Sequence, residues 1–206
     1  MIYGYLCEDI EHELFIEYSL PALVQSKMVK CKSFEKQEAF CKIKPPSSDS
    51  KYVREHFADA AKVGFTDEYS LEFFIAVIDF DDRPLASFEQ CHDDFYKKYP
   101  HKIKRKSILA IPVRSIEYWL WYLKHKKENP EKGQLENNPD FNRRKAKEDV
   151  FNIELPPGKR FSLSKDKRAE ITKGILQNAD YKWLASKSTS FHYFCERVKK
   201  FCQEYN

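Results

Sequence analysis

Residues 73–82 read Phe-Phe-Ile-Ala-Val-Ile-Asp-Phe-Asp-Asp and contain the strongest strand signal in the chain. Its apolar part does not alternate with polar residues, which is typical of a strand buried on both faces of a parallel sheet. A second unbroken apolar run, Ile-Leu-Ala-Ile-Pro-Val, follows at 108–113. Residues 2–7 predict a short first strand, and 28–43 alternate weakly enough to hold one more strand without defining its ends.

Helical patterns separate these strands. Asp9 is suited to cap a helix that Pro21 is expected to kink or end. Further helices are predicted at about 51–63, 85–98 and 115–124. Strands that alternate with helices indicate βαβ units. The predicted fold is therefore α/β and Rossmann-like, a mostly parallel sheet of about four strands with helices on both faces.

The 206 residues are predicted to form one domain in three parts. Residues 1–124 are the α/β core, and 125–163 are a polar insert with little regular structure. Residues 164–206 are expected to add C-terminal helices that pack on the core, with Ser190 as the cap of the last helix.

Composition limits the classes of partner and location. The formal net charge of +4 permits contact with DNA or RNA without demanding it. No apolar run approaches the roughly 18 residues that span a bilayer, so no membrane segment is expected. The first residues lack the basic region of a signal peptide, which favours a cytoplasmic protein whose six cysteines are reduced.

Carboxylates follow the predicted strands. Glu8 comes after the first strand, Asp79 and Asp81 end the central one, and Glu117 lies four residues beyond the third. In parallel sheets, ligands bind beyond the carboxyl ends of the strands, and extended residues i and i+2 face the same side. Oxygen ligands of this kind suit Mg²⁺ or Mn²⁺ and metal-assisted phosphoryl chemistry. The alternative is that these acids cap helices or are solvated.

Three short motifs in chain order resemble a known family. They are Cys7–Ile16 (Cys-Glu-Asp-Ile-Glu-His-Glu-Leu-Phe-Ile), Ile111–Leu120 (Ile-Pro-Val-Arg-Ser-Ile-Glu-Tyr-Trp-Leu) and Ser190–Phe194 (Ser-Phe-His-Tyr-Phe). Together with the acidic end of the central strand, they resemble the Toprim domain of topoisomerases, DnaG-type primases and OLD-family nucleases. They are also similar to a group of uncharacterised Toprim-like prokaryotic proteins.

The resemblance implies a Toprim-like fold with a divalent-metal site. Glu8 would be the general acid or base, Asp79 and Asp81 would hold Mg²⁺ or Mn²⁺, and Glu117 would support the site or bind a second ion. One residue departs from the pattern, because Asp9 stands where the family usually has glycine. Asp9 then either adds a ligand or marks a site that has lost activity.

Basic residues are the candidate contacts to phosphate. They are Lys104 and Arg105 within a basic stretch at 97–106, Arg143 and Arg144 in the insert, and Arg114 at a strand end. If they flank the acidic edge, they can neutralise a nucleic-acid backbone. The alternatives are solvated loops for the two clusters and an ion pair for Arg114.

Three functions remain open. The first is a Mg²⁺-dependent, Toprim-like nuclease acting on DNA or RNA. The resemblance adds a role in prokaryotic anti-phage or mobile-element defence, beside an ATPase partner because the chain has no P-loop motif. The second is a non-catalytic binding or regulatory subunit with a degenerate Toprim fold. The third is a receiver-like domain with Asp79 as phosphoacceptor, for which the expected lysine near a fifth strand is missing.

Overall fold

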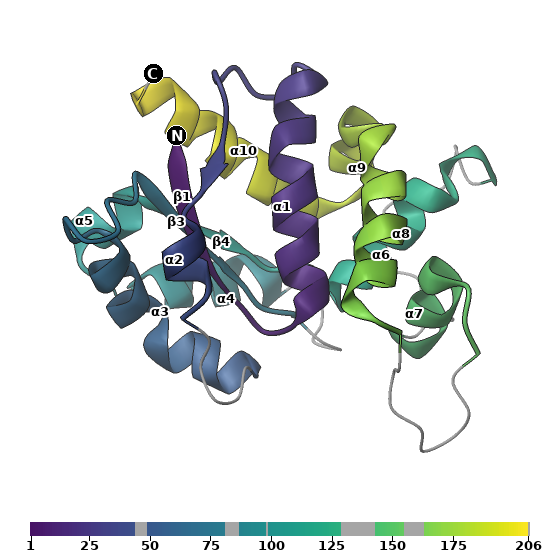
Figure 1. The fold of residues 1–206 in the computed structure, drawn as a ribbon, viewed down its shortest axis with the longest axis horizontal. Helices are drawn as coiled ribbons and strands as arrows, with labels where there is room; N and C mark the ends of the chain where they lie inside the picture. Colours follow the sequence, from purple (N-terminus) through teal and green to yellow (C-terminus); the bar gives the residue numbers. More distant parts are fainter. Residues whose placement is uncertain (44–48, 81–86, 98, 129–142, 155–162, 206) are drawn as a thin grey trace.

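A single parallel sheet forms the centre of the computed structural model, which describes residues 1–43, 49–80, 87–97, 99–128, 143–154 and 163–205 (Figure 1). The strands are β1 (Ile2–Cys7), β2 (Glu35–Lys36), β3 (Phe73–Val77) and β4 (Ser107–Ala110). Their order is β2-β1-β3-β4, and every pair is parallel. The predicted α/β class with a four-stranded parallel sheet is therefore confirmed.

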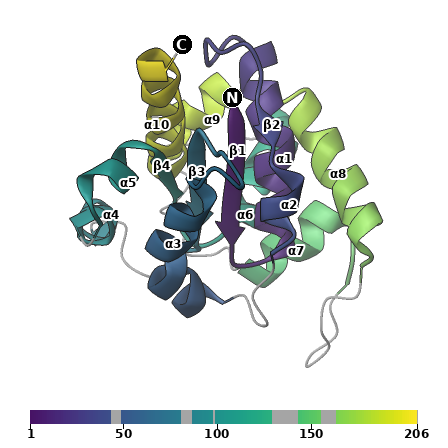
Figure 2. The same ribbon diagram turned by 60° about the vertical axis from the view of Figure 1, so that its left-hand side comes forward.

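Helices cover both faces of this sheet (Figure 2). They are α1 (Ile10–Gln25), α2 (Glu38–Cys41), α3 (Ser50–Gly64), α4 (Phe88–Lys97), α5 (His101–Arg105), α6 (Ile116–Lys124), α7 (Arg143–Phe151), α8 (Lys165–Gln177), α9 (Tyr181–Lys187) and α10 (Thr189–Tyr205), with a short 3₁₀ turn at Lys126–Glu128. No helix in these described ranges is long and apolar enough to cross a membrane.

Successive residues of β3 enter two different cores. Phe73, Ile75 and Val77 pack in one core with α1 and α6–α10, whereas Phe74 and Ala76 pack in the other with α2–α5. All five side chains are fully buried. A strand with a core on each face has no polar side, which explains the uninterrupted apolar run in the sequence.

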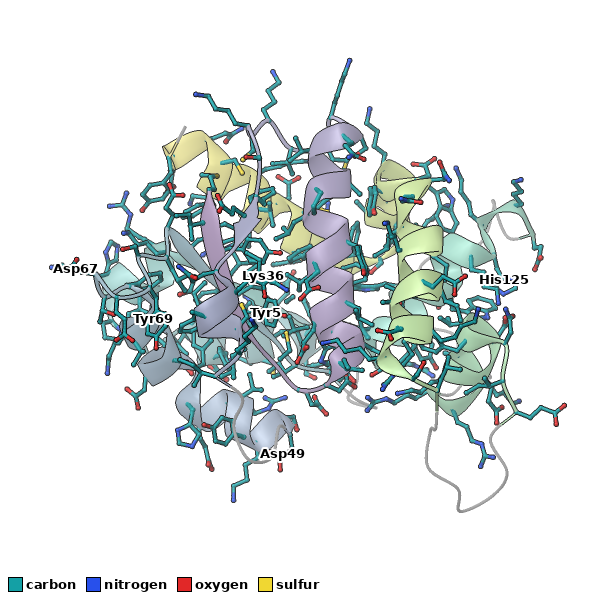
Figure 3. The ribbon with its side chains drawn as sticks, viewed as in Figure 1. Tyr5, Lys36, Asp49, Asp67, Tyr69 and His125 are labelled. Atoms are coloured by element: carbon teal, nitrogen blue, oxygen red, sulfur yellow. The ribbon has the colours of Figure 1, made fainter. Side chains whose placement is uncertain are left out.

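The edge strand β2 is tied to the first helix by side chains. The hydroxyl of Tyr5 donates to Glu17 Oε1 at 2.6 Å, and Lys36 Nζ lies 2.7 Å from the same oxygen (Figure 3). Only two residues of β2 pair with β1, so its position depends on these contacts as well as on the backbone ladder.

The structure shows that Pro21 does not end the first helix, and the cap predicted at Ser190 is wrong. Helix α1 continues past Pro21 to Gln25, because buried side chains on both sides of the proline, among them Leu20 and Leu23, hold the last turn against the core. Helix α10 begins at Thr189, so Ser190 does not precede it as a cap. The Ser190 hydroxyl instead accepts from Trp119 Nε1 at 3.1 Å and from Val113 N at 3.2 Å.

The predicted polar insert contains a helix. Within 125–163, residues 129–142 and 155–162 lie outside the described residues, but Arg143–Phe151 form α7. Ala146 and Val150 are buried one turn apart and anchor α7 beside α6 and α8. The expectation of little regular structure was therefore wrong for this segment, and α7 brings basic side chains to the sheet. The C-terminal helices pack on the core as expected, α8 against α1 and α10 against β4.

Candidate active site

The candidate site lies at the carboxyl edge of the sheet, between β1 and β3. The chain runs from β1 to β2 on one side and reaches β3 on the other, which makes this pair the topological switch point where such sheets bind ligands. Cys7 pairs with Val77, and Val77 with Ala110, so the segments that follow β1, β3 and β4 leave the sheet at one level. Glu8 and Asp79 meet there, since Glu8 Oε2 accepts from the Asp79 backbone N–H at 3.3 Å.

Asp79 is the centre of the site. Its carboxylate is fully buried, and Oδ1 accepts from Ile116 N at 3.1 Å in the first turn of α6. The same oxygen lies 2.8 Å from Nε2 of His12 on α1. The second oxygen, Oδ2, lies 2.9 Å from Arg143 Nη2 on α7. One side chain therefore connects the sheet to three helices.

Glu117 is fully buried in the first turn of α6, facing the same region. Lys147 Nζ lies 3.1 Å from its Oε1, and Arg143 Nε lies 3.9 Å from its Oε2. Neither oxygen has an aligned hydrogen-bond partner among the described residues. The ion pairs with Lys147 and Arg143 therefore hold this carboxylate.

Basic side chains from α7 and α8 close the acidic edge. Arg143 also lies 3.3 Å from Asp9 Oδ2. Glu11 is held by Lys147 Nζ at 3.3 Å and by Arg168 Nη1 at 2.9 Å. Arg143, Lys147 and Arg168 thus neutralise part of the acidic edge, including Glu11, which the sequence does not predict as a metal ligand.

The charge state of His12 follows from its neighbours. Burial lowers the pKa of an imidazole, but the carboxylates of Asp9 and Asp79 outweigh burial and raise the pKa of His12 to about 10. His12 is therefore an imidazolium at neutral pH. It also lowers the pKa of Asp9, against the opposing effect of burial, so that this carboxylate stays ionised.

Glu8 differs from Asp79 and Glu117 because it is only partly buried. Burial, followed by the nearby charge of Asp79, raises the pKa of Glu8. A cavity of about 400 Å³ opens beside it, bordered by acidic and apolar side chains from β1, the start of α1 and the end of α2, and by Arg168 of α8. A carboxyl group with a raised pKa beside an open cavity is suited to proton transfer.

The donor set fits Mg²⁺ or Mn²⁺ in chemistry, since Glu8, Asp79 and Glu117 all offer carboxylate oxygens. The buried oxygens Glu117 Oε1 and Oε2 and Asp79 Oδ2, which lack aligned hydrogen bonds among the described residues, are the atoms such an ion would bind. Within the described ranges, however, no three His, Cys, Asp or Glu side chains form a ready-made metal-binding group. Asp81, the remaining predicted ligand, lies outside the described residues.

The predicted phosphate contacts separate into different places. Arg143 reaches the acidic edge, whereas its neighbour Arg144 pairs with Glu148 at 3.1 Å on the surface. Lys104 and Arg105 lie on α5, at the amino end of β4, so the structure does not bring them to the acidic edge.

Arg114 occupies the turn between β4 and α6. Its backbone has a φ of 66°, the left-handed region that a side chain seldom adopts, and this conformation turns the chain toward Glu117. Its guanidinium lies 3.3 Å from the Tyr118 hydroxyl and over the Tyr118 ring. Arg114 is thus near the site, with its side chain stacked along α6.

The sequence predictions did not include His12 or Arg168. His12 had a signal, because it lies four residues after Glu8 and in the first turn of the helix that Asp9 caps. Lys147 follows Arg143 by four residues, which places both on one face of a helix once α7 is known. Arg168 had no local signal, since its partner Glu11 is 157 residues away.

No protein-family model, curated protein or solved structure matches this chain. The fold and the geometry of the site are therefore the basis for the function proposed below.

Proposed function

We propose that the chain is a Toprim-like, Mg²⁺-dependent phosphoryl-transfer protein that acts as a nuclease. The observation that carries this proposal is the meeting of Glu8, Asp79 and Glu117 at the switch point of a parallel sheet. These residues come from three segments far apart in the sequence, and Arg143 lies among them. Carboxylates for a metal ion together with a cation for the phosphate are the usual components of a phosphoryl-transfer site.

Each residue has a distinct role in this proposal. Glu8, Asp79 and Glu117 would hold the divalent ion, which supplies Lewis-acid polarisation of a phosphoryl oxygen when bound. The side chain of Arg143 is 41% exposed, so it can turn from Asp79 and Asp9 to a phosphate oxygen without crossing the core. Glu8 would accept or deliver a proton at the face of the cavity.

His12 and Ile116 have positioning roles. The imidazolium and the backbone N–H both bind Asp79 Oδ1, which fixes the carboxylate with its second oxygen toward Arg143. Because Asp79 has no exposed surface, water cannot compete for these contacts. Such preorganisation lowers the cost of holding charge at the reacting centre.

A second candidate, the non-catalytic binding or regulatory subunit, is favoured by the ion pairs. Arg143, Lys147 and Arg168 neutralise much of the acidic cluster. In this case the charges would only join α1, α6, α7 and α8, as a buried ionic network does in many cores. The phosphoacceptor function has less support, because both Asp79 oxygens are covered by α1, α6 and α7.

The resemblance stated above extends the first proposal to partners. It adds DNA or RNA as substrate, a role in prokaryotic defence, and an ATPase that works beside this chain. The Asp9 that replaces the family's glycine caps α1 and pairs with Arg143, so it takes part in the ionic network rather than opening the backbone to a ligand.

Cleavage assays test the proposal. Single- and double-stranded DNA and RNA are incubated with wild type, Glu8→Gln and Asp79→Asn, with Mg²⁺ or Mn²⁺ present or removed by chelation. We expect metal-dependent cleavage that falls by about a hundredfold or more in both variants, the range for loss of an acid–base group. Glu55→Gln, an exposed change of the same charge on α3, should keep full activity.

The two candidates give different outcomes. Cleavage that survives Glu8→Gln and Asp79→Asn would contradict the first proposal. Glu8→Gln is the more informative variant, because Glu8 is only partly buried and its change leaves the His12–Asp79 pair in place. Absence of cleavage by the folded wild type with either metal would favour the second candidate.

A further inference from the structure

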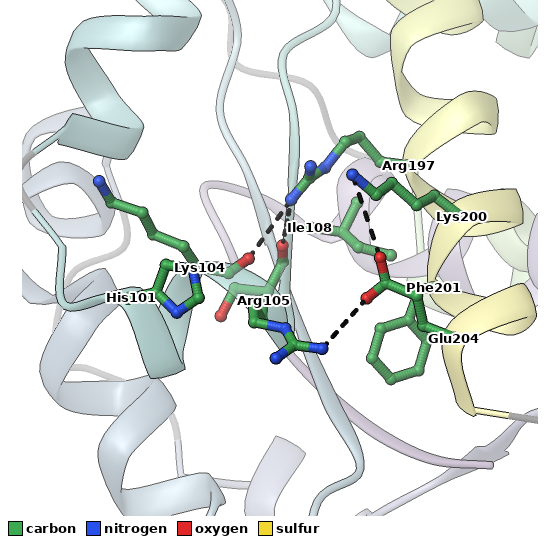
Figure 4. Close-up of a pocket in the computed structure, with 9 residues that line it drawn as sticks. His101, Lys104, Arg105, Ile108, Arg197, Lys200, Phe201 and Glu204 are labelled. Carbon is green, nitrogen blue, oxygen red and sulfur yellow. Dashed lines mark hydrogen bonds and ion pairs between the residues drawn. The ribbon is translucent and has the colours of Figure 1, made fainter.

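A second pocket lies at the opposite end of the sheet. It has a volume of about 220 Å³ and is enclosed by α5, the start of β4 and the C-terminal half of α10 (Figure 4). The described residues that line it are His101, Lys104, Arg105, Ser107, Ile108, Arg197, Lys200, Phe201 and Glu204. Because β4 begins here, this pocket is separated from the acidic site by the length of the strands.

The lining of this pocket is strongly basic. Two arginines and two lysines line it, and Glu204 is the one acid among its described lining residues. The Glu204 carboxylate lies between Arg105 and Lys200, 4.0 Å from a nitrogen of each, at the outer limit of an ion pair. A single distant carboxylate compensates only part of this charge, so the pocket attracts anions.

Arg197 gives the pocket a fixed cationic wall. Its Nη2 donates to the carbonyl oxygens of Lys104 at 3.3 Å and Ser107 at 3.5 Å. Its guanidinium also lies over the Tyr96 ring, 5.0 Å from the centroid. These contacts hold the guanidinium in place, so an anion would meet a preorganised charge.

Ile108 and Phe201 give the pocket an apolar wall beside its cations. Ser107 also borders the pocket, and its carbonyl oxygen accepts the hydrogen bond from Arg197. The pocket therefore offers positive charge for an anionic group and an apolar surface for the rest of the ligand.

We propose that this pocket binds the phosphate group of a small phosphorylated molecule, of about the size of a nucleoside monophosphate. Several cations match the charge and the acceptor oxygens of phosphate. The apolar wall and the limited volume favour a small organic portion over an extended polymer. The site does not depend on the proposed nuclease function, because it shares no residue with the acidic edge.

Isothermal titration calorimetry of the full chain tests this proposal with adenosine monophosphate, inorganic phosphate, adenosine and an unphosphorylated DNA oligonucleotide. We expect adenosine monophosphate to bind more tightly than phosphate, and adenosine not to bind. The double variant Arg105→Gln/Lys200→Gln should weaken binding by about tenfold or more, since two charge-assisted contacts are lost.

The controls separate this pocket from general surface charge. Lys62→Gln/Lys173→Gln removes the same charge from exposed positions on α3 and α8 and should leave the affinity unchanged. The proposal would be overturned if adenosine bound as tightly as adenosine monophosphate. It would also be overturned if all variants bound adenosine monophosphate with the affinity of wild type. Binding of the oligonucleotide alone, of inorganic phosphate alone or of none of the ligands would overturn it as well.

Discussion

His12 shows how a single buried residue sets the electrostatics of the acidic edge. The imidazole has no exposed surface and lies 2.8 Å from Asp79 and 3.5 Å from Asp9. Its pKa is raised to about 10 in the folded chain, from 6.5 in the unfolded chain. A raised pKa means that protonation favours folding, so the stabilisation is complete below pH 6.5 and is lost as the pH rises toward 10.

Replacement of His12 should therefore change the pH dependence of stability. At pH 6, His12→Gln should lower the free energy of unfolding by on the order of 3 kcal/mol, as for a broken buried ion pair. Urea unfolding at pH 6, 8 and 10 should show this difference shrinking as the pH rises. His56→Gln, an exposed change on α3, should follow wild type throughout. A difference for His12→Gln that stays constant from pH 6 to pH 10 would contradict the charged state of His12.

Arg143 and Arg144 form a matched pair for testing the cation that faces the acids. They are adjacent in sequence, but only Arg143 contacts Asp79, Asp9 and Glu117. Arg143→Gln should raise the affinity for Mn²⁺ by about tenfold or more, since a competing positive charge is removed from the carboxylates. Electron paramagnetic resonance of free Mn²⁺ measures this affinity. Equal affinity in Arg143→Gln, Arg144→Gln and wild type would show that Arg143 does not occupy a cation site.

At the scale of elements, the junction of α6 and α10 depends on Ser190. Its hydroxyl accepts from both Trp119 Nε1 and Val113 N in a buried region. Ser190→Ala leaves two donors unsatisfied and should lower the free energy of unfolding by about 2–4 kcal/mol. Ser186→Ala, which removes an exposed hydroxyl from α9, should cost less than about 0.5 kcal/mol. Chemical denaturation measures the stability of both variants and of wild type. Equal denaturation midpoints for Ser190→Ala and Ser186→Ala would contradict the role of Ser190.

Elements with long apolar patterns were predictable from the sequence, and short or polar ones were not. Strands β1, β3 and β4 were predicted because each contains a continuous buried run. The two residues of β2 are too few to carry a pattern. Helix α7 was missed because three of its nine side chains are buried, within a polar region rich in proline. A kink or an end was predicted at Pro21, and the helix does not end there because tertiary contacts outweigh the local signal.

The candidate site was predictable only where the strand order alone positions its residues. Because parallel strands end at one edge, Glu8 and Asp79 could be placed together from sequence. The cations that neutralise these carboxylates could not be placed from the sequence. Arg143 is 134 residues from Asp9, and it belongs to a helix that the sequence pattern did not predict. Ion pairs between residues far apart in the sequence leave no periodic pattern. The pairing of the acidic edge with cations from α7 and α8 was therefore apparent only from the fold.

On the scale of the whole molecule, the two edges of the sheet carry opposite chemistry. Carboxylates gather at the carboxyl edge, between β1 and β3, and cations line the pocket at the amino edge, beside β4. The fold thereby separates a candidate metal-dependent site from a candidate phosphate site by the length of the strands. A ligand of one site therefore need not compete with a ligand of the other.

A crystal of the protein soaked in Mn²⁺ and measured at the manganese absorption edge tests the metal site most directly. We expect an anomalous peak coordinated directly by carboxylate oxygens of Asp79 and of Glu8 or Glu117, with the Arg143 side chain turned away from Asp79. The proposed metal site would be contradicted by a crystal at saturating Mn²⁺ that shows no anomalous peak between Asp79 and Glu117. In that crystal, both carboxylates would still be paired with Arg143 and Lys147.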